Sequence, residues 1–132
     1  MRITADTNIL VRAITGDDPE QARIAERLLA DAELVAIPEV VLCELCWVLD
    51  RAYRFGGAEI AQAVRALATA DNVACNRSNV EAGLTMLEAG ADFADGVIAH
   101  AGQWLGGELF LSFDRKAVER LDARGLKAML AR

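Results

Sequence analysis

Short apolar runs alternate with longer stretches of helical periodicity along the chain. The apolar runs predict strands over residues 1–5, 34–37, 73–75, 109–113 and 126–130. The longer patterns predict helices over residues 9–14, 18–30, 38–55, 58–70, 78–90, 92–106 and 114–125. No linker or repeat interrupts this alternation, which is typical of an α/β fold. We expect a single domain over residues 1–132, with a mainly parallel central sheet of four to five strands flanked by helices.

Three local signals predict helix ends. Asp18 followed by Pro19, with Gln21 three residues after the cap, predicts a helix start. The pair Gly56-Gly57 predicts the end of the long apolar helix that opens at Pro38. Ser78-Asn79-Val80-Glu81 has the form of a capping box and predicts another start.

The composition is that of a globular protein with a core. The chain has 132 residues, of which 54% are hydrophobic and 26% charged, so it is too apolar to be disordered. The richest apolar run, residues 34–49, is broken by Pro38, Glu39 and Glu44, which excludes a membrane span. Asp6 stands where a signal peptide would need its apolar centre, so we expect a cytoplasmic protein with no membrane association. Three cysteines, an odd number, indicate reduced thiols.

The net charge of the chain indicates which kinds of molecule it can bind. A formal charge of −6 argues against binding duplex DNA through a broad basic face. It is compatible with basic partners and with a metal-assisted nuclease, whose active site is itself acidic.

Two aspartates directly follow predicted strands. Asp6 follows residues 1–5 and Asp114 follows residues 109–113. Functional groups gather beyond the carboxyl ends of parallel strands, which makes both candidates for a site. The alternative is that each only caps the helix that follows.

Glu44 is a carboxylate on an apolar helix face. At helical spacing it lies beside Val41, Leu45 and Val48. A buried carboxylate without a partner is costly, so we expect a cation, a hydrogen-bond network or a metal to face it. A structural ion pair with an arginine is the alternative.

Asp92 and Asp95 open the helix predicted over residues 92–106. Their spacing places them on one face of its first turn, where capping and the helix dipole are a sufficient alternative. If these carboxylates and the three above converge on one pocket, their repulsion requires divalent cations. Oxygen ligands without paired histidines favour Mg²⁺ or Mn²⁺ over zinc. Such clusters suit phosphodiester hydrolysis by metal-activated water.

Four short motifs resemble those of a known family. They are Asp6-Thr7-Asn8-Ile9-Leu10-Val11-Arg12, Glu44 in its apolar helix, Asp92-Phe93-Ala94-Asp95, and Ser112-Phe113-Asp114-Arg115-Lys116. In this order the sequence resembles the PIN domain, and within it the VapC-type toxins of bacterial or archaeal toxin–antitoxin pairs. The resemblance covers nearly the whole chain and implies a single-domain, three-layer PIN-like fold.

The resemblance also implies an activity, a Mg²⁺- or Mn²⁺-dependent endoribonuclease that acts as a toxin. Its metal-binding and catalytic quartet would be Asp6, Glu44, Asp95 and Asp114, with Asp92 in an accessory acidic position. Thr7, Asn8 and Ser112 match polar residues that support the pocket. Either Asp92 or Asp95 is the more direct ligand. Two positions depart from the family: Gly96 stands where Ala is common, and Ser112 where Thr is frequent.

The implied partners are an RNA substrate, a second copy of the chain in a homodimer, and a cognate antitoxin. The basic C-terminal segment of such an antitoxin would place an Arg or Lys in the acidic pocket. Arg12, Arg115 and Lys116 are candidates for contacts with RNA phosphates, with a solvated surface role as the alternative.

Several sequence features bear on functions other than a nuclease. Cys43-Glu44-Leu45-Cys46 has C-x-x-C spacing but lies inside an apolar helix, so buried thiols are favoured over a redox pair. A zinc site would need Cys43, Cys46, Cys75 and His100, which lack the usual paired spacing. A haloacid-dehalogenase-like phosphatase would use Asp6 as nucleophile, but Asn8 replaces its general acid. A non-catalytic α/β binding module remains the plain alternative. Trp47 and Trp104 fit core packing as well as base stacking.

Overall fold

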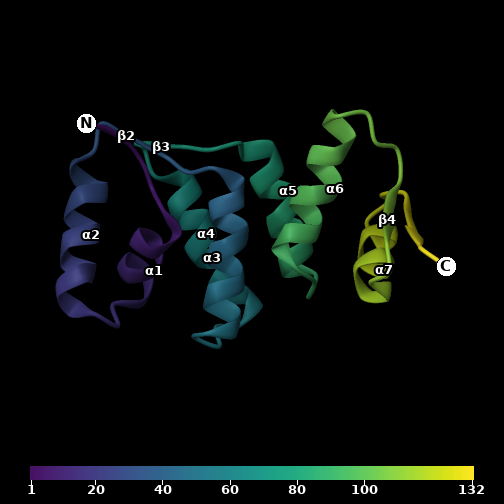
Figure 1. Cartoon of the computed structure of the whole chain (residues 1–132), viewed down its shortest axis with the longest axis horizontal. Coiled ribbons are helices and arrows are strands. Elements are labelled where there is room, and N and C mark those ends of the chain that lie inside the picture. Colours follow the sequence, from purple (N-terminus) through teal and green to yellow (C-terminus); the bar gives the residue numbers. More distant parts are fainter. The chain divides into compact units, whose positions relative to one another are not determined.

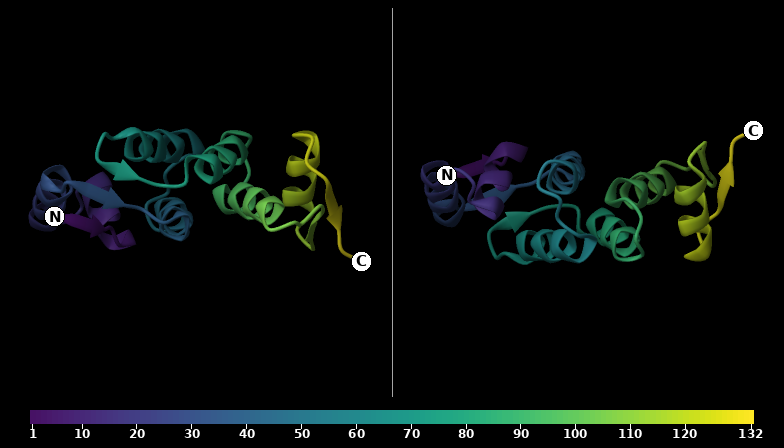
Figure 2. Two further views of the ribbon diagram at one scale, coloured as in Figure 1. Left: turned by 90° about the horizontal axis from the view of Figure 1, so that it is seen from above. Right: turned by 90° about the horizontal axis from the view of Figure 1, so that it is seen from below.

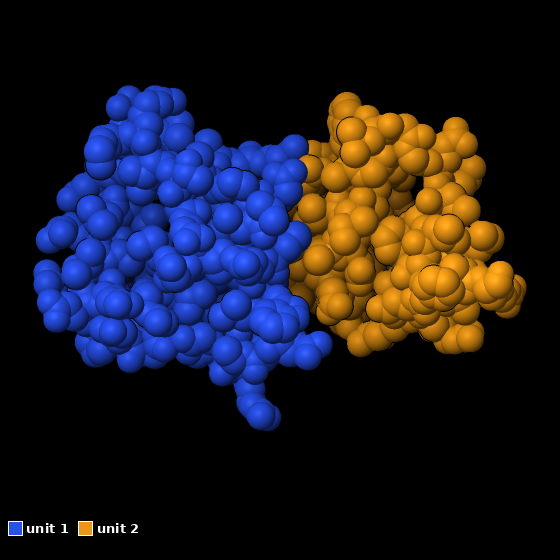
Figure 3. Space-filling model, in the orientation of Figure 1, with its two compact units in different colours: residues 1–76 blue, residues 77–132 orange.

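The computed structural model describes residues 1–132 as seven helices and five strands, numbered in chain order. Figure 1 labels all of them except β1 and β5. The chain divides into two compact units, residues 1–76 and residues 77–132, which Figure 3 shows in different colours. They are called unit 1 and unit 2 below. No helix has both the length and the apolar character that crossing a bilayer requires.

Unit 1 is built on three short parallel strands. These are β1 (Arg2–Thr4), β2 (Leu34–Ala36) and β3 (Val73–Ala74), paired in that order with Ile3 opposite Val35 and Val35 opposite Val73. Parallel strands need crossover connections, and each connection here carries two helices. The helices are α1 (Thr7–Thr15), α2 (Pro19–Asp31), α3 (Glu39–Arg51) and α4 (Gly57–Thr69).

The core of unit 1 is formed by aliphatic side chains from α1, β2, α3 and α4. Leu10, Val35, Leu45, Leu49 and Val64 are at most 1% exposed. Helix α1 contacts both α2 and α3, and α3 contacts α4. Burying each of these side chains contributes about 1.5–3 kcal/mol, so the packing holds α1 and α3 firmly together.

Unit 2 consists of a helix pair followed by a small β–α–β arrangement. Helices α5 (Arg77–Glu88) and α6 (Phe93–Trp104) lie side by side in both views of Figure 2. Strands β4 (Phe110–Ser112) and β5 (Ala128–Leu130) pair in parallel and contact the intervening helix α7 (Arg115–Ala123). A cluster of buried side chains from α5, α6 and α7 includes Met86, Ala99 and Leu121, and Phe110 packs against it.

Two glycines allow α5 and α6 to approach closely. A Cβ on Gly83 would lie 2.6 Å from the Phe93 ring, and a Cβ on Gly96 would overlap the backbone oxygen of Ala82. The departure from alanine at position 96 is therefore required by the packing of these two helices. Away from such a close approach, glycine within a helix is unfavourable relative to alanine.

The α/β class and the parallel pairing predicted from the sequence are confirmed. The five strands are divided between a three-stranded sheet in unit 1 and a two-stranded sheet in unit 2. The start signal at Asp18 is also confirmed, since its side chain accepts a hydrogen bond from the backbone N–H of Gln21 at 3.1 Å and Pro19 is the first helical residue.

Two other helix-end predictions are wrong. Gly56 is the N-cap of α4 and Gly57 its first residue, so this pair begins a helix, whereas α3 already ends at Arg51. Just after α3, Arg54 has a left-handed φ of 58°, and its backbone N–H donates to the backbone oxygen of Asp50. This hydrogen bond satisfies one of the free carbonyl groups at the end of the helix.

Ser78 does not cap α5, because that helix starts one residue earlier, at Arg77. The Ser78 hydroxyl instead lies 2.6 Å from Nε2 of His100, and Glu81 forms an ion pair with Arg77 at 3.6 Å. A contact with α6 and an ion pair within α5 are therefore found where the sequence predicted a capping box.

Substituting Gly96 tests the close packing of α5 and α6. We expect Gly96→Ala to destabilise the chain by about 1–3 kcal/mol, because the added methyl group overlaps backbone that cannot move without separating the helices. The matched control is Gly102→Ala in the same helix, where nothing lies within 4 Å of the added Cβ. The control should be neutral or stabilising by up to about 1 kcal/mol. Urea unfolding of both variants measures this, and equal effects would contradict the proposed packing.

Candidate functional site

Asp6 lies at the junction of β1 and α1, as the sequence predicts. It is the N-cap of α1, and its Oδ1 accepts a hydrogen bond from the backbone N–H of Thr7 at 2.8 Å. The capping interpretation is therefore correct for Asp6. A carboxylate has two oxygens, and capping uses only one of them, so Oδ2 can still bind a cation.

Thr7 links Asp6 to the second predicted ligand of unit 1. The Thr7 side chain is buried, and its hydroxyl donates a hydrogen bond to Oε1 of Glu44. This contact joins the first residue of α1 to the middle of α3. Asp6 and Glu44 are thus connected through one residue, and the second oxygen of each carboxylate is free of protein hydrogen bonds.

The environment of Glu44 differs from the expected apolar face. The residue is exposed, although its neighbour Leu45 is fully buried, so its charge remains solvated. No arginine pairs with it. Asn8, the third residue of the first motif, is exposed and makes no side-chain hydrogen bond.

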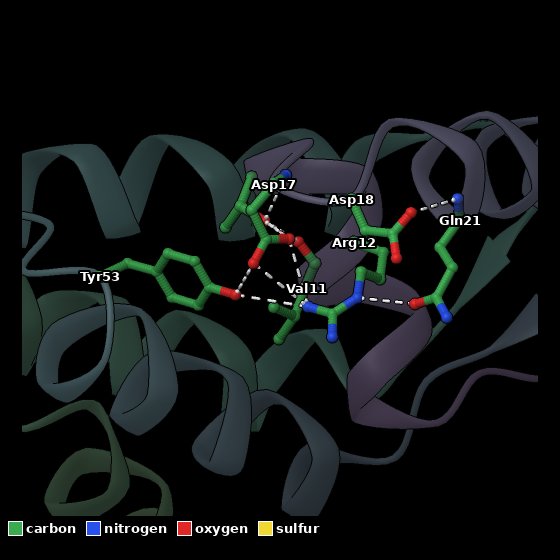
Figure 4. Close-up of polar contacts among 7 residues, drawn as sticks. Val11, Arg12, Asp17, Asp18, Gln21 and Tyr53 are labelled. Atoms are coloured by element: carbon green, nitrogen blue, oxygen red, sulfur yellow. Dashed lines mark hydrogen bonds and ion pairs between the residues drawn. The ribbon is translucent and has the colours of Figure 1, made fainter.

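Arg12 belongs to a polar network of unit 1, shown in Figure 4. Its Nε donates to Gln21 at 2.8 Å, and its Nη1 donates to Asp17 at 3.2 Å and to the Tyr53 hydroxyl at 3.3 Å. The Tyr53 hydroxyl in turn donates to Asp17 at 2.5 Å, and this hydrogen bond is the main cause that lowers the pKa of the Asp17 carboxyl. These bonds tie α1 to the end of α3. Two of the three nitrogens of Arg12 are already engaged, which weakens its candidacy as a phosphate contact.

Unit 2 brings together the other three predicted carboxylates. Asp92 is the N-cap of α6 but makes no side-chain capping hydrogen bond, and Asp95 lies in the first turn. Neither side chain accepts a hydrogen bond from the protein. Capping therefore does not account for Asp92, whereas Asp95 still lies in the first turn, where the helix dipole favours a negative charge.

Asp114 is held at the start of α7 by one hydrogen bond to its side chain and one from its backbone. Its Oδ1 accepts from the backbone N–H of Ala117 at 3.1 Å, and its own N–H donates to the Ser112 hydroxyl at 2.9 Å. Ser112 thus orients the backbone at Asp114. As with Asp6, the cap leaves Oδ2 free.

Burial and like charges raise the pKa of Asp95 to about 6. Desolvation is the largest cause, followed by the negative charges of Asp92 and Asp114. The side chain is only half-buried, yet no cation of the chain compensates it. A bound divalent cation would favour the ionised form and reverse this shift.

The predicted site residues thus form two sets, one in each unit. Unit 1 joins Asp6, Thr7 and Glu44, and unit 2 joins Asp92, Asp95 and Asp114 with Ser112. Neither unit by itself gathers three acidic, histidine or cysteine side chains in a geometry that could hold a metal ion.

A pocket of about 240 Å³ in unit 2 lies away from these carboxylates. It is lined mainly by apolar residues such as Ile98, Leu109, Phe110 and Leu126, and none of the predicted ligands borders it. It offers few polar groups for recognition, so we do not assign the chemistry to it.

The thiols do not fit the redox or zinc alternatives. Burial raises the pKa of Cys46 to about 12, with a smaller effect of neighbouring Cys43, so this thiol stays protonated. Disulfide exchange needs the thiolate, so the redox alternative is disfavoured, and Cys43, Cys46 and Cys75 are not gathered in a geometry that could hold a metal ion. His100 accepts a hydrogen bond from Trp104 Nε1 at 3.4 Å and contacts Ser78, which indicates a structural role.

Both tryptophans are exposed, contrary to core packing. Trp47 is 61% and Trp104 77% exposed, and the Arg51 guanidinium lies 5.8 Å from the centre of the Trp47 ring. Their specific interactions are this cation–π pair for Trp47 and the hydrogen bond to His100 for Trp104.

Comparison with known families identifies one match, to the family described as PIN domain, over residues 3–123. The matched region includes every carboxylate described above. Comparison with curated proteins finds no significant match.

The raised pKa of Asp95 predicts a pH-dependent stability. In the folded chain Asp95 binds its proton more tightly than in the unfolded chain, where its pKa is about 3.9. The stability that this tighter proton binding contributes is therefore fully present below about pH 4 and is lost as the pH rises through about 6. Relative to Asp95→Asn, we expect the free energy of unfolding of the wild type to fall by about 1 kcal/mol between about pH 4 and pH 7, a value reduced by solvent screening.

Urea unfolding in EDTA across this pH range measures the effect. Asp122→Asn, which removes an exposed aspartate of α7 in the same unit, is the control and should follow the wild-type pH dependence. Parallel curves for the wild type and Asp95→Asn would show that Asp95 titrates normally and is not repelled by its neighbours.

Proposed function

The chain belongs to the PIN domain family, and from this we propose that it is a metal-dependent endoribonuclease acting as the toxin of a toxin–antitoxin pair. The family match over residues 3–123 is the observation that carries the proposal, because PIN domains are typically metal-dependent nucleases. The carboxylates in both units support it. Each lies in or beside the first turn of a helix or on an exposed helix face, and each keeps an oxygen free for a cation.

The donor set fits a hard divalent cation. We assign Asp6, Glu44, Asp95 and Asp114 as ligands of Mg²⁺ or Mn²⁺, with Asp92 as an accessory carboxylate. All donors are oxygens, so zinc is disfavoured.

The metal would supply the activated water and stabilise the charge that develops on the phosphate during hydrolysis. The residues of the chain would position these components. Thr7 holds the Glu44 carboxylate through its hydroxyl, and Ser112 orients the backbone of Asp114. Asp95 would lose its proton when a cation binds, so we expect metal affinity to increase with pH through about 6.

Regulation by an antitoxin follows from the same electrostatics. Asp92, Asp95 and Asp114 make no ion pair, and the whole chain carries a formal charge of −6. We propose that a basic C-terminal segment of the antitoxin places an Arg or Lys among these carboxylates and substitutes for the metal as counter-charge. We further propose a cytoplasmic homodimer. No observation favours the phosphatase or the non-catalytic module.

Metal binding is tested by thermal unfolding with EDTA and with excess Mn²⁺. A ligand that binds only the folded state raises its stability, by about 2.7 kcal/mol at a concentration of 100 Kd. We expect Mn²⁺ to stabilise the wild type, and Asp6→Asn and Glu44→Gln to lose this gain. Asp122→Asn should keep it. If Mn²⁺ has no effect on the wild type, the metal-binding assignment fails.

Hydrolysis is tested with total RNA and the full chain in Mg²⁺ or Mn²⁺. We expect internal cleavage that EDTA abolishes and that Asp114→Asn reduces at least about 100-fold, because a lost ligand removes the activated water. Asp122→Asn is again the control. Cleavage that persists in EDTA, or equally in Asp114→Asn, would contradict the proposed mechanism.

A further inference from the structure

Positive charge is concentrated at the C-terminal end of this acidic chain. Residues 115–132 hold six of the 14 Lys and Arg residues but only two of the 20 Asp and Glu residues. The segment therefore has a formal charge of +4 within a chain of charge −6. It contains α7 and β5 and directly follows Asp114.

Three of these cations form a row on α7. Lys116, Arg120 and Arg124 are spaced four residues apart, which places them along one helix face at intervals of about 6 Å. All three are exposed and make no ion pair, even though Glu119 and Asp122 are on the same helix. We call them the cationic row.

Helix stability does not explain the whole row. Arg124 lies at the C-cap, where a cation interacts favourably with the helix dipole. Arg115 and Lys116 lie in the first turn, where a positive charge is unfavourable and where no acidic residue is present. These two residues therefore oppose the stability of α7, which indicates that something outside the helix uses their charge.

The cationic row lies close to the carboxylates of unit 2. Lys116 is two residues from Asp114, and Nη2 of Arg120 would lie 4.0 Å from a Cβ on Gly90, in the turn that leads to Asp92. A polyanion lying along the row would thus pass close to the carboxylates of unit 2.

An exposed aromatic ring adjoins the row. Phe113 is 85% exposed and directly precedes Asp114. A hydrophobic residue at this position commonly packs against the fourth residue of the helix, here Val118, but the exposure of Phe113 shows that it does not make this staple. Its ring face is open to a planar ligand.

We propose that Phe113 and the cationic row form a binding surface for single-stranded RNA, with a base stacked on Phe113 and successive phosphates on Lys116, Arg120 and Arg124. The choice of RNA rests on the proposed nuclease function. A single strand is favoured because only an unpaired base can stack on a side chain. An acidic protein segment would match the charges of the row but would not need the ring.

The test is fluorescence anisotropy of the full chain with a short fluorescein-labelled oligouridylate in EDTA, so that binding is measured without cleavage. Arg120→Gln/Arg124→Gln removes two cations of the row. Arg23→Gln/Arg27→Gln is the matched control, because it removes two exposed, unpaired arginines with the same spacing from α2. Phe113→Leu and Phe113→Trp test the ring.

Loss of two phosphate contacts should reduce the slope of log Kobs against log salt by about 1.4, whereas the control should keep the wild-type slope. Phe113→Leu should weaken binding at least about fivefold, and Phe113→Trp should preserve it, because base stacking contributes about 1–3 kcal/mol. Equal effects of the two arginine pairs would overturn the proposal. The proposal would also be overturned if polyglutamate competed as well as unlabelled RNA and Phe113→Leu had no effect on binding. The surface would then bind acidic polypeptides.

This outcome is independent of the metal. If Mn²⁺ stabilises the chain and RNA is cleaved, but Arg120→Gln/Arg124→Gln binds RNA normally, the proposed nuclease function is supported and the proposed RNA-binding surface is wrong. If RNA binding depends on the cationic row but Mn²⁺ does not stabilise the chain, the RNA-binding surface is supported and the nuclease function is wrong.

Discussion

The partial burial of Asp95 beside other carboxylates is the constraint on which the rest of the site depends. Desolvation is the main cause that raises the pKa of Asp95 to about 6, and the negative charges of Asp92 and Asp114 add to it. This arrangement costs stability at neutral pH and persists because packing enforces it. Gly96 lets α6 lie against α5, and the cluster around Leu121 holds α7 on the same helix pair. The fold thus maintains a concentration of negative charge that a divalent cation would neutralise.

Unit 1 presents its carboxylates in a different way. Glu44 is solvated and makes one hydrogen bond, to the buried Thr7, while Asp6 caps α1. The network of Arg12, Asp17 and Tyr53 ties the other end of α1 to the segment that follows α3, so α1 is linked to α3 and its flanking segment at both of its ends. In both units the carboxylates therefore retain at least one oxygen that makes no hydrogen bond to the protein.

Local signals in the sequence predicted those features that depend on a few adjacent residues. The start of α2 at Asp18 and the cap at Asp114 depend on backbone N–H groups within one turn, which the sequence displays directly. Features set by distant contacts could not be predicted. The exposure of Glu44 depends on which face of α3 is covered, and the need for Gly96 arises only from the approach of α5. Ser78 faces His100, 22 residues away, in place of its own helix end.

The central claim is that the neighbouring carboxylates Asp95 and Asp114 of unit 2 bind the same divalent cation, and a double-mutant cycle on Mn²⁺ affinity tests it most directly. Isothermal titration of the wild type, Asp95→Asn, Asp114→Asn and the double variant gives the coupling energy between the two positions. If both side chains bind one ion, the first substitution removes most of the affinity, and the effects should differ from additivity by at least about 1 kcal/mol. Additive effects, or Mn²⁺ affinity unchanged in both single variants, would contradict this claim.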